Sequence, residues 1–404
     1  MLKPSELCPA SAKLLSKCIP EYFEASALQV VEGGIPETTA LLAQDWGLIH
    51  FTGSERVGRI VASAAAKTLT PVVLELGGKC PCYVDESCPS DISQVANRII
   101  WSKTVNCGQN CISPDYLLIH KSQVDGLLPE LTRALEEQFG TDSSSPSTAS
   151  NGSSNSYKSQ LSKLVAPSHV QRAVDFIQEI EEMAKTDKHI QILSGGSSKC
   201  DKQSGYVAPT IILNAPLDSR IMKEEIFSPI LPILVVNDRD QAVEIINSMD
   251  GTPLGLYVFT KSEAVFREMT ERCRSGTAVR NDLIVQFAGP HLPFGGLGTS
   301  GMGSYRGENS FRCFSHMLPC VHRLTLPGAD LCSLRCQPFV PWKSFILSKL
   351  VPMAPSIPVL ITGKRAAVVV LLAVAVTNLV PGADVTIRST LASVLRKAAD
   401  GLSR

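Results

Sequence analysis

The hydrophobic and polar positions of the chain predict helices and strands that follow one another regularly. Short apolar runs bounded by glycine, proline or turn residues are typical of buried strands, whereas apolar residues every three or four positions indicate helices. In the first part of the chain the expected elements are a helix at 10–19, a strand at 27–32, a helix at 36–44, a strand at 48–51, a helix at 54–67 and a strand at 71–76. This order favours a parallel sheet with covered faces, which binds ligands at the carboxyl ends of its strands.

A second α/β unit is expected after residue 100. Its expected strands are 116–120, 207–213, 230–236 and 254–259, and its expected helices are 127–138, 168–184, 238–248 and 262–274. The Ser-rich segment 142–156 has few apolar residues to bury and is interpreted as a linker or loop. The G-x-G-x-x-G pattern at 296–301 is set apart from the preceding apolar run by two prolines, so a loop lining a site is favoured over a phosphate-binding turn.

Composition excludes several classes of protein. The 404 residues are 44% hydrophobic, enough for a large core, and 38 Lys+Arg balance 38 Asp+Glu, so no net charge attracts nucleic acid. The N-terminus has no basic stretch followed by an apolar one, which argues against secretion and favours reduced thiols among the 13 cysteines. Cys107 and Cys111 have no C-x₂-C or H-x₃-H partner, so no metal site is expected.

Three motifs carry candidate chemistry, each with a structural alternative. In WSKTVNCGQNCISPDY (101–116), Cys107 or Cys111 is either a nucleophile or an inert buried thiol. Glu75 of ELGGK ends an expected strand, where a desolvated carboxylate acts as a general base or simply supports the structure. FTGSERVG (51–58) is an expected strand-to-helix turn, suited to a phosphate or to no ligand at all.

The C-terminal part beyond residue 330 has a different character. An apolar segment at 366–380 is about 15 residues long, short of the ~20 that a membrane-spanning helix needs. The last 16 residues place apolar side chains on one helical face. Two interpretations stay open: a cytoplasmic protein that contacts a membrane through residues 366–404, or an apolar C-terminal helix packed on a partner.

Taken together, the ordered motifs resemble the aldehyde dehydrogenase superfamily, and most closely its class 3 branch. The resemblance covers about 80% of the chain and is carried by KPSEL (3–7), FTGSERVG (51–58), LTPVVLELGGKCPCYVD (69–85), NCGQNCISPDY (106–116), YVAPTI (206–211), MKEEIFSPILPI (222–233), LPFGGLGTSGMGSYRG (292–307) and FSHMLPC (314–320). It implies an α/β fold with a partial Rossmann-like parallel sheet and a second α/β catalytic domain. The implied domains are 1–77 for the cofactor, 78–300 for the thiol, 301–330 for oligomerisation and a tail at 331–404.

The resemblance also implies an activity and a set of site residues. Medium- or long-chain or aromatic aldehydes would be oxidised to acids with NAD, or with NADP, by a homodimer whose membrane contact would favour fatty aldehydes. Cys111 matches the family's nucleophile and Glu75 its general base. The matching cofactor positions are Lys3, Glu6, Gly53, Ser54, Gly58, Glu225 and Phe227.

Some features depart from the family pattern. The resemblance leads us to expect that a segment of roughly 100 residues, with the first strand and an oxyanion-binding asparagine, is absent ahead of KPSE. Ser228 stands in place of a glycine, and Arg280 is expected to narrow or charge the substrate tunnel. The alternative function is therefore a truncated, catalytically weak paralogue or isoform that acts as a binding or regulatory subunit.

Overall fold

A computed structural model describes residues 1–139, 161–322, 337–338, 340–345 and 348. The chain divides into two units, 1–316 and 317–404, and the fold and the site below belong to the first. Within the described ranges, no helix is both long enough and apolar enough to cross a membrane. The Ser-rich segment 142–156 and the apolar segment 366–380 lie outside the described residues.

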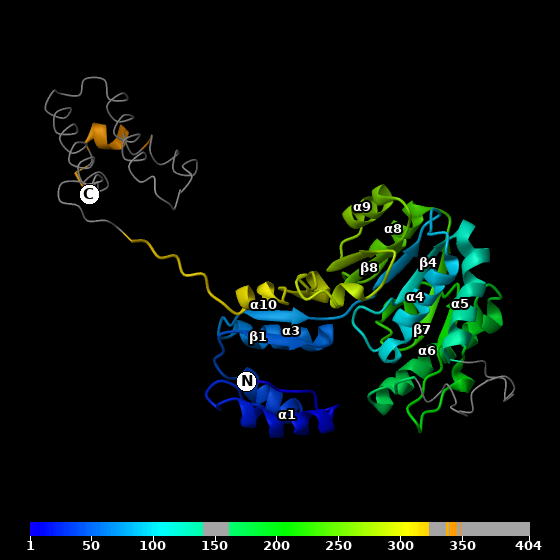
Figure 1. Cartoon of the computed structure of the whole chain (residues 1–404), viewed down its shortest axis with the longest axis horizontal. Helices are drawn as coiled ribbons and strands as arrows, with labels where there is room; N and C mark the ends of the chain where they lie inside the picture. Colours follow the sequence, from blue (N-terminus) through cyan, green and yellow to red (C-terminus); the bar gives the residue numbers. More distant parts are fainter. Residues whose placement is uncertain (140–160, 323–336, 339, 346–347, 349–404) are drawn as a thin grey trace. The chain divides into compact units, whose positions relative to one another are not determined.

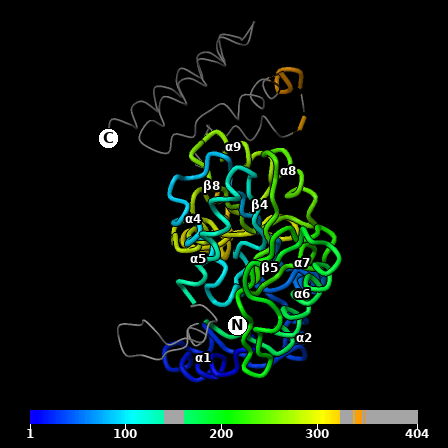
Figure 2. Tube along the Cα trace, turned by 90° about the vertical axis from the view of Figure 1, so that its right-hand side faces the viewer, coloured from blue at the N-terminus to red at the C-terminus, as the bar shows by residue number. Residues whose placement is uncertain are grey.

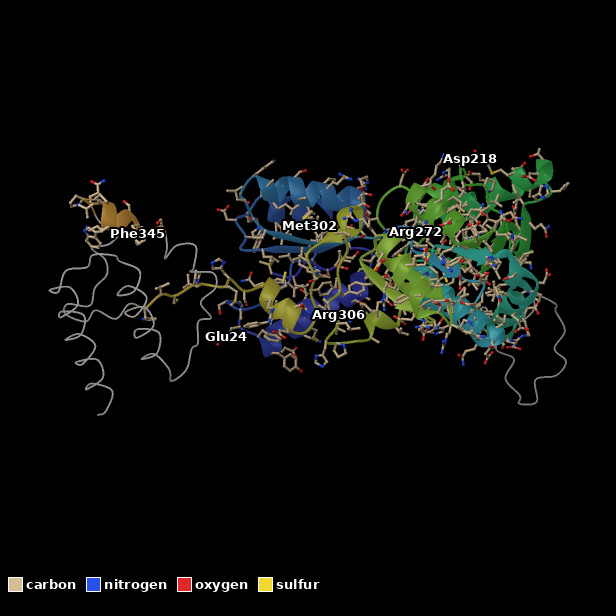
Figure 3. All side chains as sticks on the ribbon, turned by 90° about the horizontal axis from the view of Figure 1, so that it is seen from above. Glu24, Asp218, Arg272, Met302, Arg306 and Phe345 are labelled. Carbon is tan, nitrogen blue, oxygen red and sulfur yellow. The ribbon has the colours of Figure 1, made fainter. Side chains whose placement is uncertain are left out.

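A small sheet with three strands stands in the N-terminal part of this unit (Figure 1). It follows α1 (Pro9–Tyr22) and α2 (Ile35–Leu42) and consists of β1 (Ile49–Thr52), β2 (Val72–Glu75) and β10 (Gly301–Met302), with α3 (Glu55–Ala66) connecting β1 to β2. β1 and β2 are parallel, and β10 returns from much later in the chain to pair with β2 in the antiparallel sense. Figure 3 labels Met302 on this returning segment, beside the blue N-terminal elements, and Arg306 a little further along.

A large sheet with seven strands forms the rest of the unit, in the order β5-β6-β7-β4-β3-β8-β9. Its elements are β3 (Pro81–Val84), α4 (Ile92–Thr104), β4 (Tyr116–His120), α5 (Val124–Phe139), α6 (Pro167–Thr186), β5 (Gln191–Ser194), β6 (Thr210–Leu213), α7 (Arg220–Lys223), β7 (Ile230–Val236), α8 (Arg239–Ser248), β8 (Gly255–Phe259), α9 (Glu263–Arg272), β9 (Thr277–Arg280) and, after β10, α10 (Glu308–Cys313). All neighbouring pairs are parallel except β5 with β6.

The two faces of the large sheet carry two separate cores, because successive side chains of a strand point to opposite faces. In β4, Leu117 and Ile119 pack with α4 and α5, whereas Tyr116 and Leu118 pack with α6, α8 and α9. Figure 2 shows α4 and α5 on one side of β4 and β8, with α6, α7 and α8 on the other. The predicted α/β fold is thereby confirmed, with two sheets that are mainly parallel and that each contain one antiparallel pair, whereas the exact domain boundaries stay a prediction.

One expectation from the sequence is wrong. Residues 27–32 form no strand, because the only stretch alongside them is the short N-terminus, where Leu2 makes a single isolated bridge with Val30. Arg280, which was expected to narrow or charge a substrate tunnel, lies away from the candidate thiol, and that expectation stays a prediction. The Arg280 guanidinium pairs with Glu263 and donates to the Thr260 carbonyl at 3.2 Å, at the carboxyl ends of β8 and β9. The candidate thiol lies near the amino ends of the same sheet.

Candidate functional site

Three segments meet where the two sheets adjoin. Glu75 ends β2 of the small sheet, Cys111 lies in the loop before β4, and Glu225 lies between α7 and β7. The carboxylate of Glu225 packs against Gly77. It fills the space that the Cβ of any other residue at position 77 would need. The charges of both carboxylates raise the pKa of the Cys111 thiol. The structure therefore brings these three predicted site residues together from positions 150 residues apart.

A left-handed turn shapes the loop that carries the thiol. Asn106, Cys107 and Gly108 have φ angles of 51°, 57° and 70°, and such angles in residues other than glycine are uncommon and store strain. A Cβ at Gly108 would lie 2.5 Å from the carbonyl carbon and oxygen of Ser228. Only glycine at position 108 allows both this backbone angle and this close contact. The turn therefore packs the thiol loop against the segment that follows Glu225.

The two cysteines of this loop occupy different environments. Cys107 is 0% exposed and belongs to the core on the α6 face of the large sheet. Cys111 is only partly buried, with its Sγ 3.9 Å from Asn110 Oδ1. Burial raises the pKa of Cys107 to about 12, and we find no role for its side chain beyond packing. Of the alternatives left open by the sequence, the geometry favours Cys111 as the reactive thiol.

The Cys111 thiol is neutral at pH 7 in this arrangement. Burial raises its pKa to about 12, and the charges of Glu225 and Glu75 contribute in the same direction. The backbone N–H groups of Cys111 and Ile112 lower the pKa, so both donors lie close to the sulfur. A proton acceptor is therefore required to form the thiolate, and two carboxylates stand within electrostatic range.

Glu75 combines burial with a missing hydrogen bond. It is 2% exposed, and its Oε1 has no hydrogen-bond partner among the described residues. Burial raises its pKa to about 7, with a small opposing effect from the Arg306 guanidinium. A carboxyl group with such a pKa takes up and releases protons near neutral pH, which suits a general base.

Glu225 has a similar pKa for a different combination of reasons. Burial raises it to about 7, the charge of Asp115 adds to this, and the Gly78 backbone, Arg172 and Lys79 oppose it. Two residues further on, Phe227 has a φ of 48°, in the same left-handed region as the thiol loop. The segment around Glu225 is thus held in an uncommon conformation directly beside the thiol.

The strand-to-helix turn has the geometry expected of a phosphate site. Ser54 is the N-cap of α3, yet its side chain makes no capping hydrogen bond. The Gly53 N–H donates to the Glu75 carbonyl at 3.0 Å, which connects this turn with the general-base candidate. Gly58 is buried, and a Cβ there would lie 2.6 Å from Leu76 Cδ2, so its absence lets α3 pack closely on β2. The turn therefore leaves backbone donors at the start of a helix, which fit a pyrophosphate.

Lys3 and Glu6 form a separate group. Lys3 Nζ lies 3.5 Å from Glu6 Oε2 and donates to the Gly33 carbonyl at 3.0 Å. A backbone hydrogen bond and the Lys3 charge hold the pKa of Glu6 below its usual value. Across the described residues, no hydrogen bond or ion pair joins these two side chains to Cys111, Glu75 or Glu225.

Sequence reasoning did not single out the charged residues that surround this site. Lys79 and Asp115 form an ion pair and are 5% and 3% exposed. The positive charge of Arg172 lowers the pKa of Glu225, and that of Arg306 lowers the pKa of Glu75. A signal was available for the first two, because each stands at the start of a fully buried apolar run, KCPCYV and DYLLIH. Within the described ranges, no three His, Cys, Asp or Glu side chains gather to hold a metal ion.

Comparison with known proteins places the chain in a family. Residues 1–318 match the aldehyde dehydrogenase family. A mouse relative named aldehyde dehydrogenase, dimeric NADP-preferring, is 40% identical over 323 residues, which are 80% of this chain and 65% of the relative. Mouse aldehyde dehydrogenase family 3 member A2 is 38% identical over 354 residues, covering 86% of this chain and 67% of that protein. The chain thus spans about two thirds of the length of these relatives.

Solved structures agree with these matches. The substrate-bound state of Staphylococcus aureus AldH is 34% identical with a TM-score of 0.74, over 86% of this chain and 70% of that one. A Mycobacterium tuberculosis aldehyde dehydrogenase complexed with NAD+ is 26% identical with a TM-score of 0.66, over 80% of this chain and 64% of that one. From the match over residues 1–318 and the 40% identity to a relative, we conclude that the chain belongs to the aldehyde dehydrogenase family.

Proposed function

We propose that the chain oxidises aldehydes to carboxylic acids, with a nicotinamide dinucleotide as the hydride acceptor. The observation that carries the proposal is the convergence of one thiol with two carboxyl groups whose pKa values are about 7, in a chain of this family. A thiol that needs a base, next to groups that titrate near neutral pH, supports nucleophilic catalysis.

The roles of the residues follow from their positions. A nearby carboxylate takes the proton of Cys111, and the thiolate adds to the aldehyde carbon to give a thiohemiacetal. The N–H group of Cys111, which lies close to the sulfur, is a candidate donor to the oxygen as it gains charge, whereas the Ile112 N–H donates to Asn110 Oδ1 at 3.2 Å. The nicotinamide, when bound, supplies the hydride acceptor that turns this adduct into a thioester. Glu75 then takes a proton from water, whose oxygen attacks the thioester carbon and releases the acid and the thiol.

The residues present fit a dinucleotide. The start of α3, where Ser54 makes no capping hydrogen bond and Gly53 and Gly58 let the backbone pack closely, is the proposed site of the pyrophosphate, and the match of Glu225 to the family pattern supports a hydrogen bond from its carboxylate to a ribose. The negative charge of Glu6 would repel a 2′-phosphate, which favours NAD over NADP. The mouse relative is named NADP-preferring, so both dinucleotides belong in the test.

Substrate class, assembly and location are part of the same proposal. We infer medium- or long-chain aliphatic or aromatic aldehydes, a homodimer, and a cytoplasmic protein that contacts membranes through residues 366–404. The mouse relative is named dimeric, and the apolar segment at 366–380 supports membrane contact. Deleting residues 356–404 should move the protein from the membrane fraction to the soluble one. An unchanged distribution would contradict the membrane contact.

The experiment for the main proposal measures reduction of NAD and of NADP with octanal. Three chains are compared: the parent, Cys111→Ser, and Cys107→Ser as the matched control from the same loop. We expect turnover in the parent and the control and a loss of at least ~10³-fold in Cys111→Ser. Equal turnover in all three would exclude Cys111 as the nucleophile.

One observation favours the alternative of a catalytically weak binding or regulatory subunit. Helix α1 buries only Ala12, and α2 buries no residue. These two helices, which precede the proposed pyrophosphate turn at residues 53–58, therefore contribute little buried packing. This alternative predicts a folded protein that binds NADH and does not reduce NAD with any aldehyde. Such a result in the parent chain would contradict the catalytic proposal.

A further inference from the structure

A buried ion pair joins the segments that carry the two carboxylates and the thiol. Lys79 follows Glu75 by four residues, and Asp115 follows Cys111 by four residues. Their side chains are each 4% exposed and bond to one another. The pair thus connects the segment that follows β2 to the residue that precedes β4. Each partner lies four residues after one of the two candidate catalytic residues.

The same two side chains hold the third segment by its backbone. Lys79 Nζ donates to the carbonyl oxygens of Ile221 at 2.8 Å and of Glu224 at 3.0 Å. Asp115 Oδ1 accepts from the N–H of Ile226 at 3.0 Å. The peptide groups on both sides of Glu225 are therefore fixed by one ion pair, and its side chain has little freedom to leave the thiol.

Stability alone does not explain this arrangement. Buried ion pairs are often no more stabilising than apolar residues of the same volume, because removing two charges from water is costly. Methionine and leucine would fill the volume, yet they would leave two carbonyl groups and one N–H without partners. Buried backbone groups without hydrogen bonds are costly, so the segment would move to satisfy them.

A third charged residue holds the segment from the other side. Arg172 of α6 donates to the carbonyl oxygens of Glu225 at 3.0 Å and of Ile226 at 3.2 Å. It belongs to a different element and does not touch the thiol loop or β2. Arg172 can therefore retain the segment on α6, whereas the ion pair bonds the segment to the two stretches of chain that carry Cys111 and Glu75.

We propose that Lys79 and Asp115 are positioning residues, which fix Glu225 against the Cys111 thiol and against the ribose of a bound dinucleotide. The ribose contact rests on the function proposed above. The placement of the segment itself does not, because every bond in the argument is present within the chain alone.

The test compares the double variant Lys79→Met plus Asp115→Leu with the parent and with Lys185→Met. The double variant removes both charges and keeps the volume, which avoids an unpaired buried ion. Lys185 pairs with Glu182 on the exposed face of α6, so its loss is the matched control for removing a lysine. Hydrogen–deuterium exchange of the peptide spanning residues 221–230 reports on the segment, and calorimetry reports the Kd for NADH.

We expect at least tenfold faster exchange in residues 221–230 and at least tenfold weaker NADH binding in the double variant. Its thermal midpoint should stay within a few degrees of the parent, and Lys185→Met should behave as the parent. The variant Lys79→Met plus Asp115→Asn keeps an oxygen acceptor for Ile226 and leaves no unpaired charge. It should retain most of the protection at that residue, which a general loss of packing would not reproduce.

Parental exchange in a folded Lys79→Met plus Asp115→Leu variant would overturn the proposal. An equal loss of protection at Ile226 with asparagine and with leucine at position 115 would overturn it as well. A parent chain that does not bind NADH would contradict the proposed cofactor instead. In that case the exchange measurement would still decide whether the ion pair positions the segment.

Discussion

The two sheets of this protein differ in how completely they are buried, and the candidate site draws on both. In the large sheet, β4 and β8 are buried along their whole length between two layers of helices. In the small sheet, β1 alternates between half-buried and exposed positions. Among the described residues, the fully buried part of its core is Val61, Leu74 and Leu76, with partly buried side chains packed around them. Regions with few buried apolar contacts open at lower free energy than the global unfolding.

The division of roles follows this difference. Cys111 and Glu225 are carried by loops at the amino ends of β4 and β7, two interior strands of the large sheet, where buried neighbours restrict their positions. Glu75 and the turn at residues 53–58, which we propose to hold the pyrophosphate, belong to the small sheet. The chemistry that needs accurate placement of the thiol rests on the well-packed region, and we infer that a bound dinucleotide would stabilise the other region through binding energy.

The largest effect that would sharpen this comparison comes from truncating one isoleucine in each sheet. Ile233 of β7 is 0% exposed, so Ile233→Ala should cost about 2–5 kcal/mol of unfolding free energy through lost burial and a cavity. Ile49 of β1 is only half-buried, and Ile49→Ala should cost about 1 kcal/mol. Urea denaturation measures both. Equal costs would mean that the two sheets are equally well packed.

The pH dependence of stability provides a second test, of somewhat smaller size. The pKa of Glu75 is about 7 in the folded chain against 4.5 for an ordinary glutamate, so the folded state holds its proton more tightly. Its contribution to stability is therefore present below pH 4.5 and is lost as the pH rises toward 7. Glu75→Gln should be up to about 3 kcal/mol more stable than the parent at pH 8, with no advantage at pH 4.5.

Urea denaturation at the two pH values checks this expectation. Glu182→Gln, on the exposed face of α6, is the matched control and should change the free energy of unfolding by less than about 0.5 kcal/mol at either pH. A variant of Glu75 that is less stable than the parent at pH 8 would show that its carboxylate has a stabilising partner.

Two glycine substitutions give the smallest of the three effects. A Cβ at Gly58 would lie 2.6 Å from Leu76 Cδ2, so Gly58→Ala should cost about 1–3 kcal/mol and weaken dinucleotide binding. A Cβ at Gly126 in α5 would meet nothing within 4 Å, and Gly126→Ala should stabilise by about 0.4–1 kcal/mol. Thermal unfolding measures both, and a neutral Gly58→Ala would contradict close packing of α3 on β2.

The buried strands of the large sheet were predictable from the sequence. The runs at 116–120 and 230–236 form β4 and β7 with the expected bounds, because apolar stretches this short between turn residues are typical of buried strands and are short for a helix. Glu75 was also placed correctly at the carboxyl end of its strand, since β2 ends there.

Other features depended on tertiary contacts that periodicity does not encode. The segment at 27–32 has strand-like alternation and finds no neighbouring strand, whereas β3 lies inside a motif whose prolines and cysteines conceal it. Glu75 stands at the carboxyl end of its strand in the small sheet, whereas Cys111 stands at the amino ends of the strands of the large one. No local signal shows that Glu225 lies against Gly77.

The measurement that tests the central claim most directly is mass spectrometry of Glu75→Gln after mixing with octanal and NAD. The variant should form the thioester and hydrolyse it slowly, because it lacks the base. Cleavage after Lys103 and Lys121 gives one peptide that contains both Cys107 and Cys111, and its fragments distinguish the two. We predict an octanoyl group on Cys111. An octanoyl group on Cys107, or none in a folded chain that binds NAD, would contradict the account.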